Sequence, residues 1–124
     1  MRPQEKQFAS YVVIGLINTL IHGVVFFTLH IGLAISQAYS NLSAFAVAVS
    51  FSFYANARYT FNAKRSWSRY LRFVAFMGSL SLSVGYLADF YLLAPIITWL
   101  VFSAISLCCG FLYSKRVIFR EGAP

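Results

Sequence analysis

The sequence is poor in charged residues, and above all in acidic ones. Only 10% of its 124 residues are Asp, Glu, Lys or Arg, and only three of these are acidic. An ordinary soluble domain carries about 25% charged residues, and a soluble domain this small leaves much of its chain exposed to water. So few charged side chains cannot cover such a surface. The composition therefore argues against a soluble globular enzyme and against a disordered binding segment.

Residues that carry chemistry are also scarce. The two cysteines, Cys108 and Cys109, are adjacent in an apolar stretch and belong to no CxxC motif or His/Cys ligand set. We find no nucleophile with a base, no paired carboxylates and no phosphate-binding glycine loop. We therefore expect neither an enzyme nor a bound metal or cofactor, and we interpret both cysteines as small buried residues.

Hydrophobic residues make up 60% of the chain, and aromatic residues make up 19%. Residues 7–57 contain no Asp, Glu, Lys or Arg, and a spanning helix needs about 20 apolar residues. That stretch therefore fits two spans joined by a turn near residues 32–37. The apolar runs are continuous rather than alternating, which favours helices over a barrel. We predict an all-α integral membrane protein of one domain, residues 1–124, with four spans at residues 8–31, 38–57, 70–92 and 95–114.

The basic residues predict the orientation of these spans. All ten lie before the first span, around the loop between the second and third, or after the fourth. The positive-inside rule then places both termini in the cytoplasm. So strong a bias argues against a dual-topology dimer. Basic residues at this rim contact anionic lipid head groups, so the net charge of +7 requires no nucleic-acid partner.

An internal repeat appears at an offset of 58 residues. Residues 53–61 align with residues 111–119, with Phe, Arg and Phe matching in the same order. The same offset superposes two rows of small or polar residues: Ala48, Ser52 and Asn56 on Ser106, Gly110 and Ser114. Such rows face other helices, because small side chains allow close approach. We predict two tandem helical hairpins forming a parallel repeat about an axis along the membrane normal.

Each hairpin ends with a polar residue followed two residues later by an arginine. Arginine presents forked donors that match phosphate oxygens, and the Asn56 amide adds further donors. The candidate lipid-phosphate site is therefore Asn56 with Arg58, and Arg116 with Lys115 is the second candidate. The alternative is that the arginines only cap helix C-termini and anchor the spans.

Polar residues also occur inside the predicted first span. Asn18 and His22 are four residues apart, and Thr19 lies beside them. Buried polar groups face other helices or a cavity. One interpretation is hydrogen bonding between helices, which we favour for Thr19. The other is contact with a substrate head group that crosses the membrane.

Asp89 is the only acidic residue inside the predicted spans, about one turn from the outer end of the third. Its expected partner is His30, near the outer end of the first span. Proton coupling, contact with a sugar hydroxyl and simple exposure to water all remain open for this carboxylate.

Three segments together resemble GtrA-like proteins. They are YVVIGLINTLIH at residues 11–22, FAVAVSFSFYANARYTF at residues 45–61 and FSAISLCCGFLYSKRVIFR at residues 102–120. The resemblance extends over residues 8–120 in the same order. One departure is Ser114, which stands where the family often has Asn, so it weakens the second phosphate-site candidate.

This resemblance implies a flippase that moves undecaprenyl-phosphate-glucose from the cytoplasmic to the periplasmic leaflet of the bacterial inner membrane. It implies two partners, a polyprenyl-phosphate glucosyltransferase that supplies the lipid and a serotype-specific glucosyltransferase that uses it to modify O-antigen. Four helices leave little room for a groove, so we expect a homo-oligomer or a complex. The expected sugar path is a polar seam of Asn18, Thr19, His22 and Asp89.

Two alternatives belong to other classes of protein. One is a non-transporting membrane subunit that anchors or stabilises the glucosyltransferase. The other is a small multidrug-type exporter that uses Asp89 as its coupling acid. The rim position of Asp89 argues against the exporter.

Overall fold

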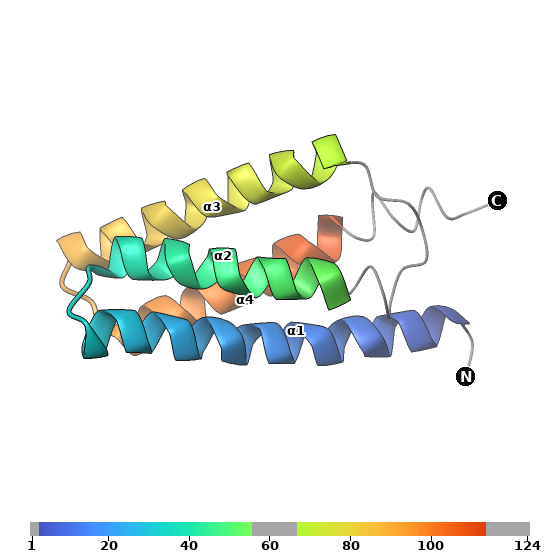
Figure 1. Cartoon of the computed structure of the whole chain (residues 1–124), viewed down its shortest axis with the longest axis horizontal. Coiled ribbons are helices and arrows are strands. Elements are labelled where there is room, and N and C mark those ends of the chain that lie inside the picture. The colour runs from blue at the N-terminus through green and yellow to red at the C-terminus, as the bar shows by residue number, and fades with distance from the viewer. Residues whose placement is uncertain (1–2, 56–66, 114–124) are drawn as a thin grey trace.

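The computed structural model describes residues 3–55 and 67–113, and all regular structure within these ranges is helical. The elements are α1 (Pro3–Phe27), a π-helical turn (Thr28–Gly32) that continues it, α2 (Gln37–Ala55), α3 (Trp67–Phe90) and α4 (Pro95–Tyr113) (Figure 1). Each predicted span coincides with one of these helices. The largest difference is at the start of α1, which extends into the polar residues before the apolar run. Pro3 suits this first helical position, because its missing N–H would have no partner there.

Three helical segments of the described residues are long and apolar enough to cross a membrane: Ala9–Gly32, Tyr70–Phe90 and Pro95–Leu112. α2 is not among them, because polar residues interrupt its apolar sequence. Its first two turns contain Gln37, Ser40 and Asn41, and all three side chains are buried. α2 lies between α1 and α3 (Figure 1), so these three side chains meet protein rather than the surroundings of the bundle.

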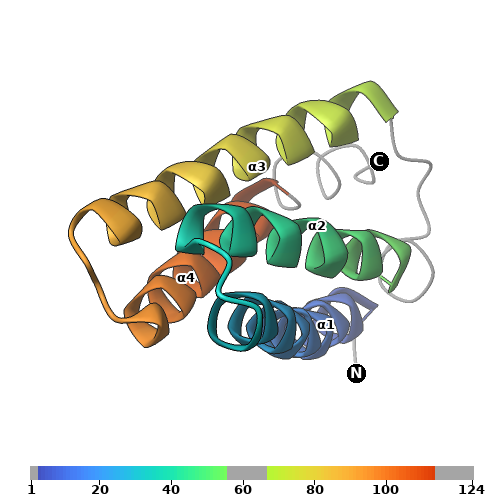
Figure 2. The ribbon, with the colours of Figure 1, turned by 60° about the vertical axis from the view of Figure 1, so that its left-hand side comes forward.

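The four helices pack unevenly. α2 packs closely along both α1 and α3, whereas α4 packs more loosely against its neighbours on the other side of the bundle (Figure 2). A strict two-fold repeat would give α2 and α4 equal surroundings. The described helices follow each other as two hairpins, but the packing around the second helix of each hairpin differs.

Apolar side chains cover the outside of the bundle as well as its inside. Phe45, Met77 and Phe102 form a buried cluster from α2, α3 and α4, and Phe26 of α1 is fully buried. Many large apolar residues are instead exposed, among them Leu20, Val24 and Leu92. Exposed apolar patches larger than a few hundred Å² mark contacts with protein or membrane.

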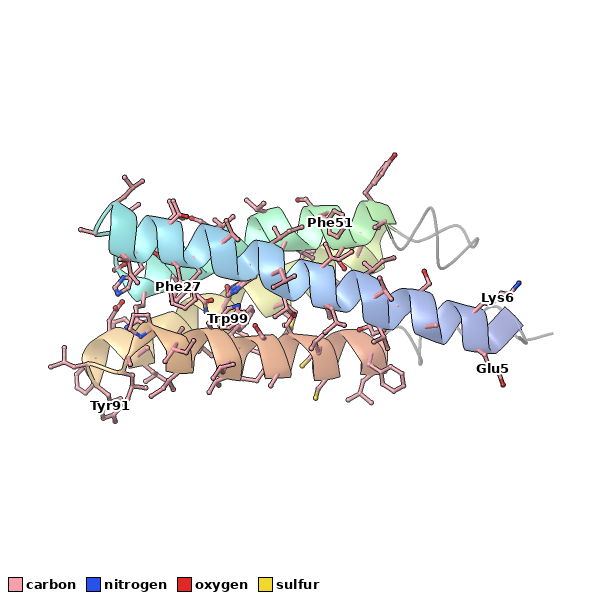
Figure 3. All side chains as sticks on the ribbon, turned by 90° about the horizontal axis from the view of Figure 1, so that it is seen from below. Glu5, Lys6, Phe27, Phe51, Tyr91 and Trp99 are labelled. Carbon is pink, nitrogen blue, oxygen red and sulfur yellow. The ribbon has the colours of Figure 1, made fainter. Side chains whose placement is uncertain are left out.

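Two short turns lie at the same end of the bundle, which we call the turn end (Figure 1). The opposite end holds the first residues of α1 and the last of α4, and we call it the terminal end. Figure 3 shows Tyr91 at the turn end, and Glu5 and Lys6 at the terminal end. The same view shows Phe27 and Trp99 between α1 and α4, where their rings meet edge to face.

At the turn end, every backbone N–H of the first turn of α2 has an acceptor. Ser36 precedes the helix, and its side-chain and backbone oxygens accept from the third and fourth residues, Tyr39 and Ser40. The carboxylate of Asp89 accepts from the first two, with distances of 2.9 Å to Gln37 N and 3.0 Å to Ala38 N. The N–H groups of Gln37, Ala38 and Tyr39 have no partner within the helix, so the turn and α3 supply their acceptors, while the Ser40 N–H makes the first regular helical bond, to Ser36 O.

The expected pairing of Asp89 with His30 is wrong. Asp89 lies in the last turn of α3, and the close approach of α2 brings backbone N–H groups to both of its oxygens. His30 Nδ1 instead lies 2.7 Å from the backbone oxygen of Ile35, within its own turn. Because a backbone carbonyl only accepts, Nδ1 donates in this bond.

The Gln37 side chain ties the two turns together. Its Nε2 donates to Leu93 O at 2.8 Å, and its Oε1 accepts from the hydroxyl of Thr98 in α4. Beside it, Gly85 of α3 allows the backbones to touch: an added Cβ would lie 2.5 Å from Gln37 O and 2.6 Å from Ala38 Cα. The turn end is therefore tightly packed and fully hydrogen-bonded around the start of α2.

Candidate functional site

A cavity of about 80 Å³ lies among the four helices, on the terminal side of the hydrogen bonds just described. Its inner end is lined by His22, Phe45 and Phe102, and its lining reaches Tyr11 and Gly110 toward the terminal end. The polar lining comes from α1 (Tyr11, Asn18, Thr19, His22), α2 (Ser52), α3 (Tyr70) and α4 (Ser103, Ser106).

The internal repeat reappears in the walls of this cavity. α2 and α4 line it with residues 58 positions apart, so the two helices present the same face in the same register. The pairs are Phe45 with Ser103, Ala48 with Ser106, Val49 with Leu107 and Ser52 with Gly110. The structure thus places the first two members of both predicted rows on the cavity. The third members, Asn56 and Ser114, lie outside the described residues.

His22 occupies the inner end of the cavity and is only 3% exposed. Its Nε2 lies 2.8 Å from Asn41 Oδ1 in α2, and Asn41 Nδ2 donates to the backbone oxygen of Ser81 in α3 at 2.7 Å. The imidazole stacks on Phe26 and contacts Phe102. These contacts join α1, α2 and α3 and fix the orientation of the ring.

The Thr19 side chain does not make the predicted hydrogen bond between helices, and only the Thr19 backbone oxygen bonds to another helix. Its hydroxyl donates to Gly15 O in its own helix at 3.0 Å. Its backbone oxygen accepts from Trp99 Nε1 of α4 at 3.1 Å, and the Trp99 indole lies over Gly23, where a Cβ would lie 2.8 Å from Nε1. Thr19 therefore helps to hold α4 against α1.

The structure brings some of the predicted site residues together and separates others. Asn18, Thr19 and His22 all line the cavity, whereas Asp89 caps α2 at the turn end and is absent from its lining. The candidate lipid-phosphate residues Asn56, Arg58, Lys115 and Arg116 lie outside the described residues.

Sequence reasoning missed Asn41 and Ser103. Asn41 follows Gln37 by one helical turn, which is the same spacing that drew attention to Asn18 and His22. Ser103 precedes the predicted row on α4 by about one turn, and the repeat places it opposite Phe45. The spacing of Asn41 and the repeat position of Ser103 can be read from the sequence, whereas the burial of their polar atoms cannot.

The described lining contains hydroxyl, amide and imidazole groups and no Asp, Glu, Lys or Arg. Such a surface offers hydrogen bonds rather than net charge, which suits a neutral ligand rich in hydroxyls. Sites that enclose small molecules have volumes of about 300 Å³ or more, so the cavity as described must widen to take one. Of the helices that line the cavity, α4 packs least closely against the others.

Comparison with known proteins gives one consistent result. The profile of the family described as GtrA/DPMS, transmembrane domain, matches residues 10–119. The bactoprenol-linked glucose translocase of Salmonella phage P22 is 54% identical over 116 residues, which cover 94% of this chain and 97% of that protein. The protein of the same name in Shigella phage SfX and a prophage homologue in Escherichia coli K12 are each 53% identical with the same coverage. No solved structure matches.

Proposed function

The chain belongs to the GtrA/DPMS transmembrane-domain family, and we propose that it translocates bactoprenol-linked glucose from the cytoplasmic to the periplasmic leaflet of the bacterial inner membrane. Relatives with the name bactoprenol-linked glucose translocase align over 94% of the chain. The structural observation that carries the proposal is the uncharged polar cavity among the four helices. It offers hydrogen bonds to sugar hydroxyls inside a protein whose outer surface is largely apolar.

The proposed topology is a single domain, residues 1–124, with four spans and both termini in the cytoplasm. α2 serves as the fourth span, because its most polar residues, Gln37, Ser40 and Asn41, are buried against the other helices. The basic residues support this orientation, since all ten lie in the parts of the chain predicted to be cytoplasmic. The cavity then lies in the half of the bundle that faces the leaflet from which the substrate is loaded.

We place the lipid phosphate at the terminal end of the cavity. Asn56 comes directly after α2, four residues beyond the cavity-lining Ser52, and Arg58 follows it. Lys115 and Arg116 follow α4 in the same way. Only the head group enters the protein, while the polyprenyl tail remains in lipid. This avoids exposing the phosphate and the sugar hydroxyls to hydrocarbon.

The small cavity volume supports an assembly. A homo-oligomer, or a complex with the polyprenyl-phosphate glucosyltransferase, can widen the passage by drawing α4 away from α1 and α3. A serotype-specific glucosyltransferase then uses the delivered lipid for O-antigen modification. In this proposal the protein moves the lipid without changing a covalent bond, and either the substrate gradient or protons drive transport.

Leaflet exchange of undecaprenyl-phosphate-glucose in liposomes tests this function. Wild-type protein, Arg58→Ala, Arg65→Ala and empty liposomes are compared, with Arg65 as a matched arginine from the same loop. A hydrogen bond to a charged group contributes about 1.5–3 kcal/mol, so Arg58→Ala should slow exchange by about tenfold or more. Arg65→Ala should exchange at the wild-type rate. Equal rates of exchange above the empty liposomes in all three proteins would support the translocase function but rule out Arg58 as the phosphate contact.

The second candidate function is a non-transporting subunit that anchors the glucosyltransferase. The cavity of about 80 Å³ favours it, because this volume does not enclose a hexose. Folded wild-type protein that gives no exchange, alone or with the transferase, would support this reading. The exporter alternative is not proposed, since Asp89 is committed to capping α2.

A further inference from the structure

Two buried polar atoms lack a hydrogen-bond partner in the part of the chain that the structure describes, and both belong to residues that line the cavity. They are His22 Nδ1 and Ser103 Oγ. Ser103 directly follows Phe102, whose ring centroid lies 5.4 Å from that of the imidazole. Buried polar atoms nearly always have a partner. Two unpartnered atoms at one end of a polar cavity therefore indicate a ligand.

The hydrogen bonds around His22 determine what kind of atom this ligand must supply. The Ser81 backbone oxygen can only accept, so the nitrogen of the Asn41 amide must face it, and Asn41 Oδ1 must face His22. Oδ1 also only accepts, so Nε2 of His22 carries the hydrogen. In the neutral imidazole, Nδ1 is then a bare acceptor. Nδ1 of this cavity-lining residue therefore requires a hydrogen-bond donor.

A phosphodiester anion cannot meet this requirement, because it carries no proton and only accepts. A sugar hydroxyl can, and a second hydroxyl can pair with Ser103 Oγ, which both donates and accepts. We propose that His22 Nδ1 and Ser103 Oγ form a hydroxyl-binding subsite for the glucose head group. The lipid-linked sugar then enters sugar first, with its phosphate held toward the terminal end. This assignment rests on the proposed function and adds the orientation of the substrate to it.

Water could supply the same O–H groups, so the test must separate a sugar from trapped water. Purified protein in nanodiscs is titrated with undecaprenyl-phosphate-glucose and, separately, with undecaprenyl phosphate. The wild-type protein should prefer the glucosylated lipid. The phosphate of undecaprenyl phosphate carries more negative charge than that of the glucosylated lipid. The change in the ratio of the two dissociation constants from wild type to variant therefore measures the contribution of the sugar.

Three variants test the two atoms. Ser103→Ala removes the unpartnered hydroxyl, and His22→Gln keeps an amide donor for Asn41 while removing the imidazole acceptor. Ser50→Ala is the matched control, because Ser50 is exposed on α2 and its hydroxyl bonds only to Ala46 O. We expect the preference for the glucosylated lipid to fall about tenfold in His22→Gln and about threefold in Ser103→Ala. Affinity for undecaprenyl phosphate should stay the same in both, and Ser50→Ala should match the wild type in every measurement.

The unfolding temperature of the ligand-free variants shows whether a loss of sugar preference comes only from a destabilised fold. Ser103→Ala should unfold at the wild-type temperature or above, because it removes a buried hydroxyl that has no partner. A variant that keeps the full sugar preference would show that water fills this site and would overturn the subsite. Equal losses for both lipids would also overturn it, because the residues would then act on the phosphate or on folding. Failure of the proposed translocase function is distinguishable from failure of the subsite. In that case the wild-type protein itself would show neither exchange nor sugar preference.

Discussion

The two ends of the bundle differ in whether their buried polar groups have hydrogen-bond partners. At the turn end, Gln37 and Asp89 are surrounded by polar atoms that all find partners, and the first turn of α2 has every N–H satisfied. At the inner end of the cavity, His22 and Ser103 each keep one buried atom without a partner. A polar residue within a span therefore does not by itself mark a site. An unsatisfied atom beside a cavity is the more specific sign.

The closeness of helix packing also differs between elements. Gly85 lets α3 approach the backbone of α2 at the turn end, whereas α4 as a whole packs less closely against its neighbours than α2 does. Close-packed and fully bonded regions have few alternative arrangements. We infer that the turn end holds the helices together and that α4, the less closely packed helix, shifts when the cavity widens.

The largest expected effect comes from Gly85→Ala. The new Cβ would lie 2.5 Å from Gln37 O and 2.6 Å from Ala38 Cα, and backbone atoms cannot move aside as a flexible side chain can. Overpacking of this kind destabilises by about 3 kcal/mol. Unfolding in detergent should therefore occur at a clearly lower temperature. Gly32→Ala is the control, because no atom lies within 4 Å of its added Cβ. If the two variants were equally stable, the turn end would not be the rigid part of the bundle.

Asp89→Ala should have the next largest effect. It removes both acceptors from the first two N–H groups of α2, and losing a helix cap costs about 1–2 kcal/mol. Asp89→Asn keeps one oxygen and should lose about half as much. Thermal unfolding measures the loss, and liposome exchange by the folded fraction should be unchanged in both variants. If the Asp89→Asn protein folded but gave no lipid exchange, Asp89 would have a role in transport and not only in capping α2.

Filling the cavity should affect transport and spare stability. Ser106→Leu places an apolar side chain in the wall formed by α4, so the head group loses the space it needs. We expect exchange of undecaprenyl-phosphate-glucose to fall about tenfold, which corresponds to about 1.4 kcal/mol. Ser83→Leu makes the same change on an exposed face of α3 and should leave exchange unaltered. Similar rates in both variants would mean that the substrate does not use this cavity.

The sequence predicted the helices well because continuous apolar runs and Pro95 define them locally. The repeat also predicted that Ser52 and Gly110 occupy equivalent places, and both line the cavity. Asn18 and His22 could be grouped because a spacing of four residues places side chains on one helical face. Each of these successes rests on information within one helix or on a comparison of two.

The cysteines are not both buried as predicted, since Cys108 is exposed and Cys109 only half-buried. The failures at the candidate site involve contacts between helices. The partner of Asp89 depends on where the turn at residues 33–36 places the start of α2, and periodicity does not determine this. His30 is also near the turn end, but its Nδ1 is taken by Ile35 O. The unpartnered state of Ser103 is harder still, because it requires the position of every neighbouring donor and acceptor. Sequence patterns identify which residues are polar, and only the packed bundle shows which of them remain unsatisfied.

The smallest expected change in stability comes from Thr98→Val, and it gives the most direct comparison of the two ends. Thr98→Val removes a hydroxyl that pairs with Gln37 Oε1 and leaves that oxygen buried without this donor. Stability should fall by about 1 kcal/mol, while Thr28→Val, the same change at an exposed position, should have no effect. Ser103→Ala also deletes a buried hydroxyl, yet its stability should hold or rise because that hydroxyl has no partner. Thermal unfolding of the three variants therefore tests whether removing a paired hydroxyl lowers stability while removing an unpaired one does not. If Ser103→Ala lost as much stability as Thr98→Val, Ser103 would be an ordinary structural serine, and the contrast between the two ends would disappear.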